Sequence, residues 1–499
     1  MSTTQQQEVQ PLSEAAAAFV AGPHGLLIGD GWTAAADGRT FSTHDPSTAA
    51  AICDVALAGP EDVARAVTAA RAALEGAWRE VTPAECARLM LRLADLLESR
   101  AGLLAEIEAL DNGKPVRMAR VVDVPLAVEQ LRYYAGWPTK ITGDTLPVSA
   151  PGMHVYTRRE PVGVCAQIVP WNFPLYTAVQ KVAPAVAAGC TVVLKPAEQT
   201  PLTALMLGRL VQEAGFPPGV VNVLTGDGTT GAALVDHPGV DKIAFTGSTS
   251  VGREIGVKAA QAFKRVTLEL GGKSPSIVLP DADVEQTARG AYQAMYFNTG
   301  QVCQAGTRLF VHRDQHDELV AALAERASKA RVGPGLAPDT QLGPVVSAEQ
   351  HERVLQYIRS GIEEGAKLVV GHGGEANAGR GWFVRPSLFT GVDDDMAIAR
   401  EEIFGPVLVA MPYDDLDEVA RRANASEYGL AAYVWTGDLA AGHRLAAKLQ
   451  AGSVFVNTVT MNDPAAPFGG FKSSGIGREG GEANLDAYLE TKTVWTRIG

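Results

Sequence analysis

The chain has 499 residues, which is too long for one simple hydrophobic core, so two or three domains are expected. Its 46% hydrophobic and 20% charged residues are typical of a globular protein and exclude a disordered or fibrous one. The formal net charge of −13 argues against nucleic acid as a partner, because binding phosphates needs clustered Lys and Arg side chains.

The amino terminus and the apolar segments predict neither export nor a membrane span. Met1–Gln10 is polar and lacks the basic and hydrophobic regions of a secretory signal, as well as the arginines of a transit peptide. The most apolar long run, Val182–Leu194, contains Pro184 and Gly189 and is too short to cross a bilayer. We therefore expect a cytoplasmic protein.

The cysteines indicate a reducing compartment. They are odd in number, widely spaced and without a CxxC pair, which fits no disulfide framework: Cys53, Cys86, Cys165, Cys190 and Cys303. Cys165 and Cys190 stand in apolar strand-like runs, where a buried thiol packs like a hydrophobic residue. We predict that four of the five are small core residues. Cys303 differs, because it follows polar residues and a glycine that suit an exposing loop.

Strand and helix patterns alternate regularly from residue 162 onward, whereas the preceding segment Ala50–Glu106 is rich in Ala, Leu and Arg and is predicted to be helical. The apolar strand-like runs are Val162–Val169, Thr191–Leu194, Val220–Leu224, Lys242–Phe245 and Val266–Leu270. The helical stretches between them include Leu175–Ala188, Leu202–Glu213 and Ser250–Ala262. Short apolar strands that alternate with helices indicate a parallel sheet covered on both faces. This predicts a Rossmann-like domain with its ligand site at the carboxyl ends of the strands.

A second α/β stretch begins near Ser274. Ser276–Leu279 and Arg308–His312 are predicted strands, and Val284–Met295 and Gln315–Arg331 are predicted helices. The sequence shows no obvious linker, so we expect the domains to pack closely.

The expected phosphate-binding motif of a Rossmann fold, G-x-G-x-x-G, is absent. Instead the strand Lys242–Phe245 runs through Gly247 and Ser248 into a helix, whose first N–H groups could face a pyrophosphate. The alternative is an ordinary strand–loop–helix junction with Ser248 or Ser250 as the N-cap. A P-loop at Gly272 is excluded, because Thr267 stands where its first glycine is required. With no H-E-x-x-H or G-x-S-x-G motif, no metal site and no serine hydrolase are expected.

Four further blocks carry recognisable chemistry: Pro170–Pro174 (PWNFP), Val266–Lys273 (VTLELGGK), Phe297–Cys303 (FNTGQVC) and Glu401–Pro406 (EEIFGP). In this order they resemble the signatures of the aldehyde dehydrogenase superfamily, and the resemblance extends from about Leu27 to Trp495.

The resemblance implies an α/β aldehyde dehydrogenase fold with three parts. A Rossmann-like NAD-binding domain would comprise residues 1–138 and 161–273, and an α/β catalytic domain residues 274–472. A small β element, residues 139–160 and 488–499, would mediate association as a homodimer or homotetramer. Its β-prone runs Val155–Thr157 and Thr493–Trp495 are of the kind that invite pairing between subunits.

The chemistry of aldehyde oxidation needs a nucleophile, an acceptor for hydride, donors for an oxyanion and a base that activates water. The resemblance implies Cys303 as nucleophile, Asn172 as oxyanion donor together with the Cys303 backbone N–H, and Glu269 as general base. A free thiol with pKa near 8.5 is only about 3% thiolate at pH 7, so local activation of Cys303 is expected. Without the surrounding motifs, Cys303 would be interpreted as an inert buried cysteine, Asn172 as a turn residue and Glu269 as part of a surface ion pair. Glu269 also distinguishes hydrolytic members from those that pass the acyl group to coenzyme A.

The resemblance further implies that NAD is bound. Lys195 and Glu198 would contact the adenosine ribose, Glu402 the nicotinamide ribose, and Phe404 the ring. The other expected cofactor contacts are Ile168, Trp171, Gly247 and Ser248. A 2′-phosphate about 4 Å from Glu198 would be repelled by roughly 4 kcal/mol at an effective dielectric of about 20. That is roughly a thousandfold in affinity if Glu198 cannot swing away, so NAD is expected over NADP.

The expected substrate tunnel combines phenylalanines with small and amide residues, which suits a neutral aldehyde of medium size. Its predicted members are Phe173, Thr177, Gln180, Val302, Gln304, Thr458, Val459, Asn462 and Phe468. The stretch Asp463–Gly470 looks like that of phenylacetaldehyde dehydrogenases, so an arylacetaldehyde is the first candidate. A medium-chain aliphatic aldehyde and a non-catalytic binding or structural protein on the same fold are the alternatives. Glu479 matches a glutamate that assists proton release in some members, and a structural ion pair explains it equally well.

Overall fold

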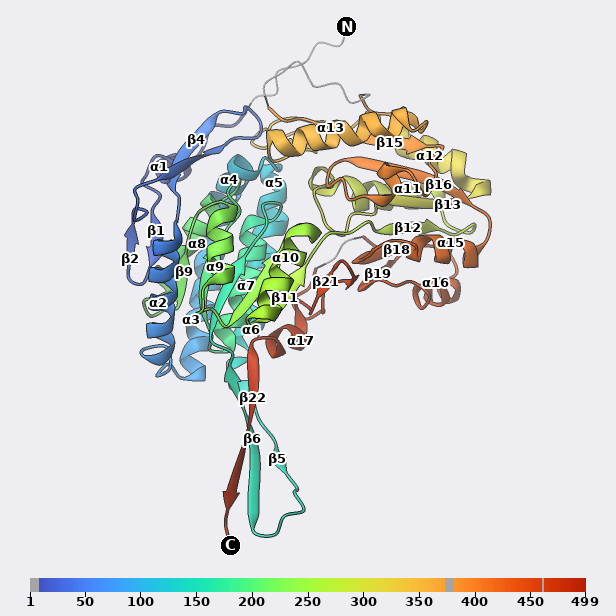
Figure 1. The fold of residues 1–499 in the computed structure, drawn as a ribbon. Helices are drawn as coiled ribbons and strands as arrows, with labels where there is room; N and C mark the ends of the chain where they lie inside the picture. The colour runs from blue at the N-terminus through green and yellow to red at the C-terminus, as the bar shows by residue number, and fades with distance from the viewer. Residues whose placement is uncertain (1–8, 373–380, 460–461) are drawn as a thin grey trace.

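Two α/β lobes and a projecting β ribbon make up the chain in a computed structural model that describes residues 9–372, 381–459 and 462–499 (Figure 1). Both lobes consist of a mostly parallel sheet with helices on its faces. The ribbon extends away from the lobes and contains the carboxyl terminus.

The first lobe is built on an eight-stranded sheet with the order β2-β1-β9-β8-β7-β10-β11-β21. Its strands are β1 (Leu26–Ile28), β2 (Gly31–Thr33), β7 (Val164–Ile168), β8 (Thr191–Lys195), β9 (Val221–Val223), β10 (Lys242–Thr246), β11 (Arg265–Glu269) and β21 (Gly475–Ile476). Strands β7 to β11 are parallel to one another, which confirms the predicted Rossmann-like sheet. The chain order 7-8-9 runs outward on one side and 10-11 on the other, so the winding reverses between β7 and β10. Such a switch point is where open α/β sheets bind ligands.

Helices cover both faces of this sheet. The bounds are α1 (Glu14–Val20), α2 (Pro60–Glu75), α3 (Pro83–Ser99), α4 (Ala101–Asn112), α5 (Val116–Met118), η1 (Ala119–Asp123), α6 (Val124–Ala135), η2 (Pro138–Lys140), α7 (Pro174–Ala187), α8 (Leu202–Ala214), α9 (Gly228–Asp236) and α10 (Thr249–Gln261). One hydrophobic cluster packs α3, α4, α6, α7 and α8 against one face. A second cluster packs α2, α9 and α10 against the other. The strands are buried on both faces, which explains their uninterrupted apolar sequences.

The prediction for Ala50–Glu106 was wrong at its beginning. Ala51–Ala56 is a strand, β4, which pairs antiparallel with β3 (Thr40–His44) in a separate two-stranded sheet. The composition of this segment favours helix, but the pairing partner lies outside it, so local sequence could not reveal the hairpin. Cys86, Cys165 and Cys190 are buried as predicted, whereas Cys53 on this strand is only half-buried and packs against the edge of a hydrophobic cluster.

The second lobe contains a seven-stranded sheet with the order β14-β15-β16-β13-β12-β18-β19. Its strands are β12 (Pro275–Val278), β13 (Arg308–His312), β14 (Lys367–Val370), β15 (Ser387–Thr390), β16 (Val407–Tyr413), β18 (Ala431–Trp435) and β19 (Ser453–Val456). The flanking helices are α11 (Val284–Tyr296), η3 (Phe297–Gly300), α12 (Arg313–Ser328), α13 (Ala348–Glu363), α14 (Ala397–Arg400), α15 (Leu416–Asn424) and α16 (Leu439–Ala446). One cluster holds α11 and α12 on one face, and another holds α13 to α16 on the opposite face.

The projecting ribbon is a three-stranded antiparallel sheet of β5 (Thr145–Leu146), β6 (Met153–Pro161) and β22 (Leu489–Arg497) (Figure 1). Strands β6 and β22 pair along their whole lengths, from Leu489 opposite Pro161 to Arg497 opposite Met153. The remaining elements are α17 (Gly481–Asp486) and a small sheet of β17 (Tyr428–Gly429) and β20 (Phe471–Lys472). Among the residues described, no helix combines the length and the apolar character needed to cross a membrane.

Candidate active site

A cavity of about 610 Å³ lies where the two lobes meet. Its walls come from the carboxyl edge of the first sheet and from loops of the second lobe. In the first sheet Asn172 follows β7, Gly247 and Ser248 follow β10, and Glu269 ends β11. Because carboxyl ends of parallel strands share one edge, residues almost a hundred positions apart reach the same cavity. Cys303 joins them from the loop after η3.

Asn172 lies in the turn between β7 and α7 and is buried. Its side-chain amide donates a hydrogen bond of 2.9 Å to the main-chain carbonyl of Gln301. An amide nitrogen carries two N–H groups, so this bond uses one and leaves the other for a further acceptor. The turn residue is therefore joined directly to the loop that carries Cys303.

The loop before Cys303 has an unusual backbone. Asn298 and Thr299 both adopt positive φ, 49° and 57°, a region that residues other than glycine rarely occupy. Consecutive residues of this kind persist only where surrounding contacts hold them. Behind the loop, a Cβ on Gly272 would collide with the Cys303 carbonyl, so the absence of a side chain there permits the close approach.

Cys303 is half-buried. Burial raises the pKa of Cys303 well above its ordinary value, and the nearby carboxyls of Glu402 and Glu269 raise it further. The sequence led us to expect that neighbouring side chains lower the pKa of Cys303. This expectation was wrong, because these side chains raise it. The apolar burial and two acidic neighbours disfavour a negative charge on sulfur.

Glu269 is only 3% exposed, and neither carboxylate oxygen has a hydrogen-bond partner among the described residues. Burial, reinforced by the nearby Glu479 carboxyl, raises the pKa of Glu269 well above its ordinary value. Gly469 closes over it, since a Cβ there would lie 2.7 Å from the Glu269 Oε1 atom. The alternative of an exposed salt bridge is wrong, because burial keeps this carboxyl from solvent.

Glu479 forms an ion pair with Lys181 of α7, and both side chains are buried. Glu479 thus forms the structural ion pair that was the alternative to a role in proton release. Glu479 also lines the cavity, and its charge acts on Glu269.

Glu402 and Phe404 reach the cavity from the loop between α14 and β16. The Glu402 Oε1 atom accepts a 2.9 Å hydrogen bond from the Gly272 N–H, and burial raises the pKa of Glu402 to about 7. Phe404 has a positive φ of 60°, and its ring meets that of Trp171 edge-on at 5.2 Å between centroids. Trp171, Glu402 and Phe404 all line the cavity, and Trp171 and Phe404 are in contact there.

Three predicted cofactor contacts lie beside the cavity and are not among its lining residues. Ile168 and Lys195 are register partners at the carboxyl ends of β7 and β8. Lys195 is buried and pairs with Glu198 at 3.3 Å, whereas the Glu198 side chain is 41% exposed. Ser248 does line the cavity, but it is also the N-cap of α10, since its hydroxyl accepts from the Val251 N–H. Both interpretations of the Gly247–Ser248 junction are therefore compatible with one geometry.

Most of the predicted tunnel lines the cavity: Phe173, Thr177, Gln180, Val302, Gln304, Asn462 and Phe468. Thr458 and Val459 are not among the lining residues. The prediction missed Val122 and Leu126 from the η1–α6 segment, and Tyr176 and Phe297. Tyr176 and Phe297 lie in or next to the recognised motifs, so their position in the sequence could have identified them as cavity residues. Val122 and Leu126 carry no local signal, because only packing brings their helix to the cavity.

A switch point of a parallel sheet that opens onto a second α/β lobe is the arrangement of a two-lobed dehydrogenase. The family model described as "Aldehyde dehydrogenase family" matches residues 32–494. A phenylacetaldehyde dehydrogenase of Pseudomonas fluorescens is 49% identical over 480 residues, which cover 95% of each chain.

Solved structures of aldehyde dehydrogenases are also similar to this chain. An NAD+ complex of aldehyde dehydrogenase from Bacillus cereus is 49% identical, with a TM-score of 0.96 over 99% of this chain and 100% of that one. An indole-3-acetaldehyde dehydrogenase of P. syringae, solved with NAD+, is 42% identical, with a TM-score of 0.92 over 95% of this chain and 96% of that one. The chain belongs to the aldehyde dehydrogenase family.

Proposed function

We propose that this enzyme oxidises an aldehyde to the free carboxylic acid through a thioester on Cys303, and that Glu269 activates the water that releases the product. The chain is an aldehyde dehydrogenase, and NAD is its cofactor. One observation carries the hydrolytic proposal: Glu269, a buried carboxyl without a partner among the described residues, shares a cavity with the Cys303 thiol.

The cavity and its rim have the donors and acceptors that NAD requires. The first N–H groups of α10 and the Ser248 hydroxyl suit a pyrophosphate, and the Lys195–Glu198 pair suits ribose hydroxyls. Glu402 would hold the nicotinamide ribose, with Phe404 beside the ring. When bound, the nicotinamide supplies an acceptor for one hydride.

The first half of the reaction depends on Cys303 and Asn172. The Cys303 thiol gives up its proton to solvent water, and its sulfur forms a bond to the aldehyde carbon while the carbonyl electron pair moves to oxygen. The free Asn172 N–H and the Cys303 backbone N–H would stabilise that oxyanion. As the C=O bond re-forms, the former aldehyde hydrogen leaves with its electron pair as hydride, and an acyl thioester remains on Cys303.

The second half depends on Glu269. Its carboxylate accepts a proton from water, whose oxygen then bonds to the thioester carbon. The carbon–sulfur bond breaks and the carboxylic acid leaves. The Cys303 thiolate then takes the proton that Glu269 received from water, which restores the thiol and the carboxylate. A raised pKa suits this role, because a stronger base removes the proton of water more readily near neutral pH.

An arylacetaldehyde is the proposed substrate. Besides Phe404, three phenylalanines line the cavity, namely Phe173, Phe297 and Phe468, and the first two stack with 6.1 Å between ring centroids. Aromatic walls favour an aromatic substrate through offset or edge-to-face contacts. Two relatives of this chain are named for phenylacetaldehyde and indole-3-acetaldehyde, which supports the same class.

A panel of arylacetaldehydes and medium-chain aliphatic aldehydes, assayed with NAD and without coenzyme A, tests these proposals. We expect NADH formation without coenzyme A and the highest kcat/KM with an arylacetaldehyde. NADH that forms only when coenzyme A is added would disprove the hydrolytic mechanism. A higher kcat/KM for aliphatic aldehydes would disprove the substrate class alone.

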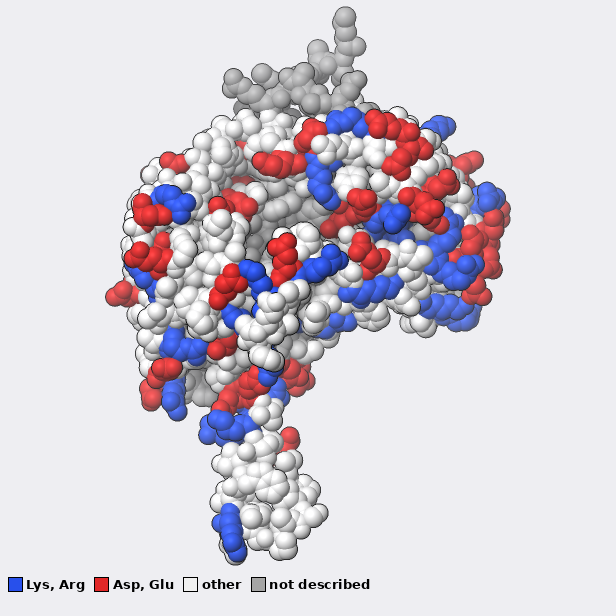
Figure 2. Space-filling model, in the orientation of Figure 1, with Lys and Arg blue, Asp and Glu red and all other residues white. Residues whose placement is uncertain are grey.

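The projecting ribbon is the proposed site of association into homodimers or homotetramers. Its visible face is largely uncharged, whereas acidic and basic side chains are scattered over the visible face of the first lobe and dense on that of the second (Figure 2). Trp495 and Ile498 are 59% and 69% exposed near the end of the ribbon. Burying such apolar side chains against a second copy would remove them from water.

A further inference from the structure

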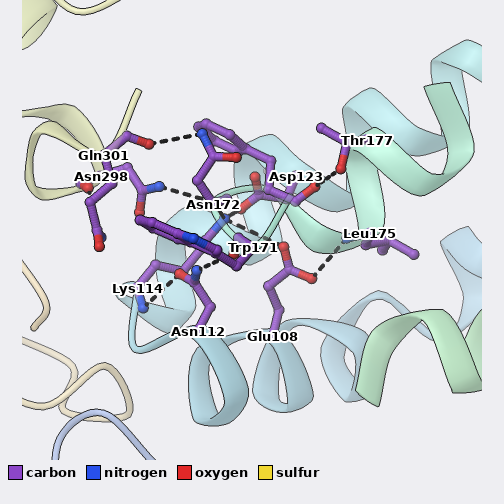
Figure 3. A network of polar contacts seen from close by, with 11 residues as sticks. Glu108, Asn112, Lys114, Asp123, Trp171, Asn172, Leu175, Thr177, Asn298 and Gln301 are labelled. Atoms are coloured by element: carbon purple, nitrogen blue, oxygen red, sulfur yellow. Dashed lines mark hydrogen bonds and ion pairs between the residues drawn. The ribbon is translucent and has the colours of Figure 1, made fainter. Parts of the chain in front are cut away.

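We propose that Lys114 is a positioning residue, which fixes the main chain of Asn172 so that the Asn172 amide points at the reacting oxygen. The inference rests on the proposed oxyanion role of Asn172. Figure 3 shows Lys114 together with Asn112 and Glu108 in the lower part of the network, with Asn172 above them.

The Lys114 ammonium has a partner for each of its three protons. It donates to the Asn172 main-chain carbonyl at 2.9 Å, to Asp123 Oδ2 at 3.2 Å and to Glu108 Oε1 at 3.4 Å. The residue is 3% exposed, and its ammonium also lies 4.4 Å from the centroid of the Phe173 ring. A buried ammonium whose donors are all used is held in one place.

The Asn172 carbonyl also accepts a hydrogen bond from a second donor. The Asn298 side-chain amide donates to it at 3.0 Å, from the loop with positive φ that leads to Cys303. The same carbonyl therefore links Lys114 to the nucleophile loop (Figure 3). Since the Asn172 amide also binds Gln301, both the backbone and the side chain of Asn172 are fixed to that loop.

The neighbouring backbone is held by the same segment of chain. Asn112 donates to the Trp171 carbonyl at 2.7 Å. Glu108 accepts from the Leu175 N–H at 3.4 Å, in the first turn of α7. Each end of the turn from Trp171 to Leu175 thus depends on the segment from Glu108 to Lys114, and Lys114 holds its centre.

The two carboxyl groups beside Lys114 explain why a lysine stands at this position. Glu108 and Asp123 are buried and cannot be solvated, so a buried cation between them offsets their mutual repulsion. Burial raises the pKa of Asp123 to about 7, and the Lys114 charge opposes that rise. A neutral side chain at position 114 would lose both this compensation and the bond to Asn172.

Lys114 lies outside the cavity lining, so it acts on the site through the lining residues that it contacts, chiefly Asn172, whose carbonyl it binds, and also the Phe173 ring. Oxyanion stabilisation depends steeply on donor placement, and a misplacement of about 1 Å can cost about a hundredfold in rate. Release of the Asn172 carbonyl is expected to reduce acylation and leave NAD binding unchanged.

A double-mutant cycle tests the inference on the full-length enzyme. The variants are Lys114→Met, Asn172→Ala and their combination, with Lys140→Met as the matched control at an exposed lysine. We expect Lys114→Met to lower kcat/KM for the aldehyde roughly 10- to 100-fold, with the Kd for NAD changed less than about twofold. The double variant should lose little more than Asn172→Ala alone, because both changes remove one function.

The outcomes separate this inference from the proposed function. If the losses from Lys114→Met and Asn172→Ala multiply in the double variant, or if Lys114→Met retains full kcat/KM, the positioning role is wrong. If Asn172→Ala itself retains full activity, the proposed oxyanion role fails first. Should Lys114→Met not fold, the neutral triple variant Glu108→Gln, Lys114→Met, Asp123→Asn replaces it in the cycle. Asn298→Ala, which removes the second donor, must show the same non-additivity with Asn172→Ala.

Discussion

The Asn172 side-chain amide donates to the Gln301 main-chain carbonyl, 2.9 Å away and two residues before Cys303. This bond joins the carboxyl end of a strand in the first lobe to a loop of the second lobe. The proposed oxyanion donor is therefore bonded directly to the loop of the proposed nucleophile, although 131 positions separate the two residues in the chain (172 to 303).

Replacement of Cys303 by alanine should abolish NADH formation. The variant has no sulfur to form the thioester, and no other described cysteine lines the cavity. NADH production in an aldehyde assay is the measurement, and Cys53→Ala, at a half-buried cysteine on β4, is the control. Turnover by Cys303→Ala would assign the nucleophile elsewhere.

Replacement of Glu269 by glutamine should separate the two half-reactions. Hydride transfer does not need the carboxylate, so one NADH should form rapidly per active site. Thioester hydrolysis should then slow by roughly 10²- to 10⁴-fold, the range for loss of a general base. Stopped-flow measurement of NADH gives both phases, and an unchanged steady-state rate would remove Glu269 from hydrolysis.

The hydrolytic step should depend on pH through Glu269. A general base acts when deprotonated, so the rate should rise with pH as the carboxyl loses its proton. Burial raises the pKa of Glu269, which places the midpoint of this rise well above 4.5, the ordinary value for Glu. The measurement is the steady-state rate of the wild type from pH 5 to 9, with a substrate for which hydrolysis limits turnover. This rate should show the rise. The Glu269→Gln profile should lack it.

Replacement of Glu198 by serine should weaken the preference for NAD over NADP. The Glu198 carboxylate would repel a 2′-phosphate, but its side chain is 41% exposed and solvent screens part of that repulsion. We therefore expect the ratio of kcat/KM values for NAD and NADP to fall about 10- to 100-fold, less than the limit for a rigid pair. An unchanged ratio would place the discrimination at another residue.

Introduction of a charge on the ribbon should disrupt association. Trp495→Glu would place a carboxylate where the proposal buries an exposed indole, and analytical ultracentrifugation should show a smaller species. Val257→Glu, at a 54% exposed position on α10, is the control outside the ribbon. A Trp495→Glu variant with the wild-type sedimentation coefficient would argue against association through this strand.

The parallel strands of the first sheet, β7 to β11, were predictable because they are largely buried and read as apolar runs, whereas β1, β2 and β21 of the same sheet were not predicted. β13 agrees with its prediction at both ends, and β7, β8, β10 and β11 agree within two residues. The sequence predicts helix where β4 lies, because its partner β3 is outside the Ala-rich segment Ala50–Glu106. α9, Gly228–Asp236, was not predicted, since glycines and threonines dominate its first half.

By itself, the sequence determined the parallel sheet, the family and the residue types of the site, because these follow from apolar periodicity and from short contiguous motifs. Only the tertiary structure decided the electrostatics, in which burial raises the pKa of Cys303 and Glu269 instead of activating the thiol. It alone also placed Lys114 under Asn172 and Val122 in the cavity wall. Burial and contact between distant segments depend on packing in three dimensions, and no local pattern encodes them.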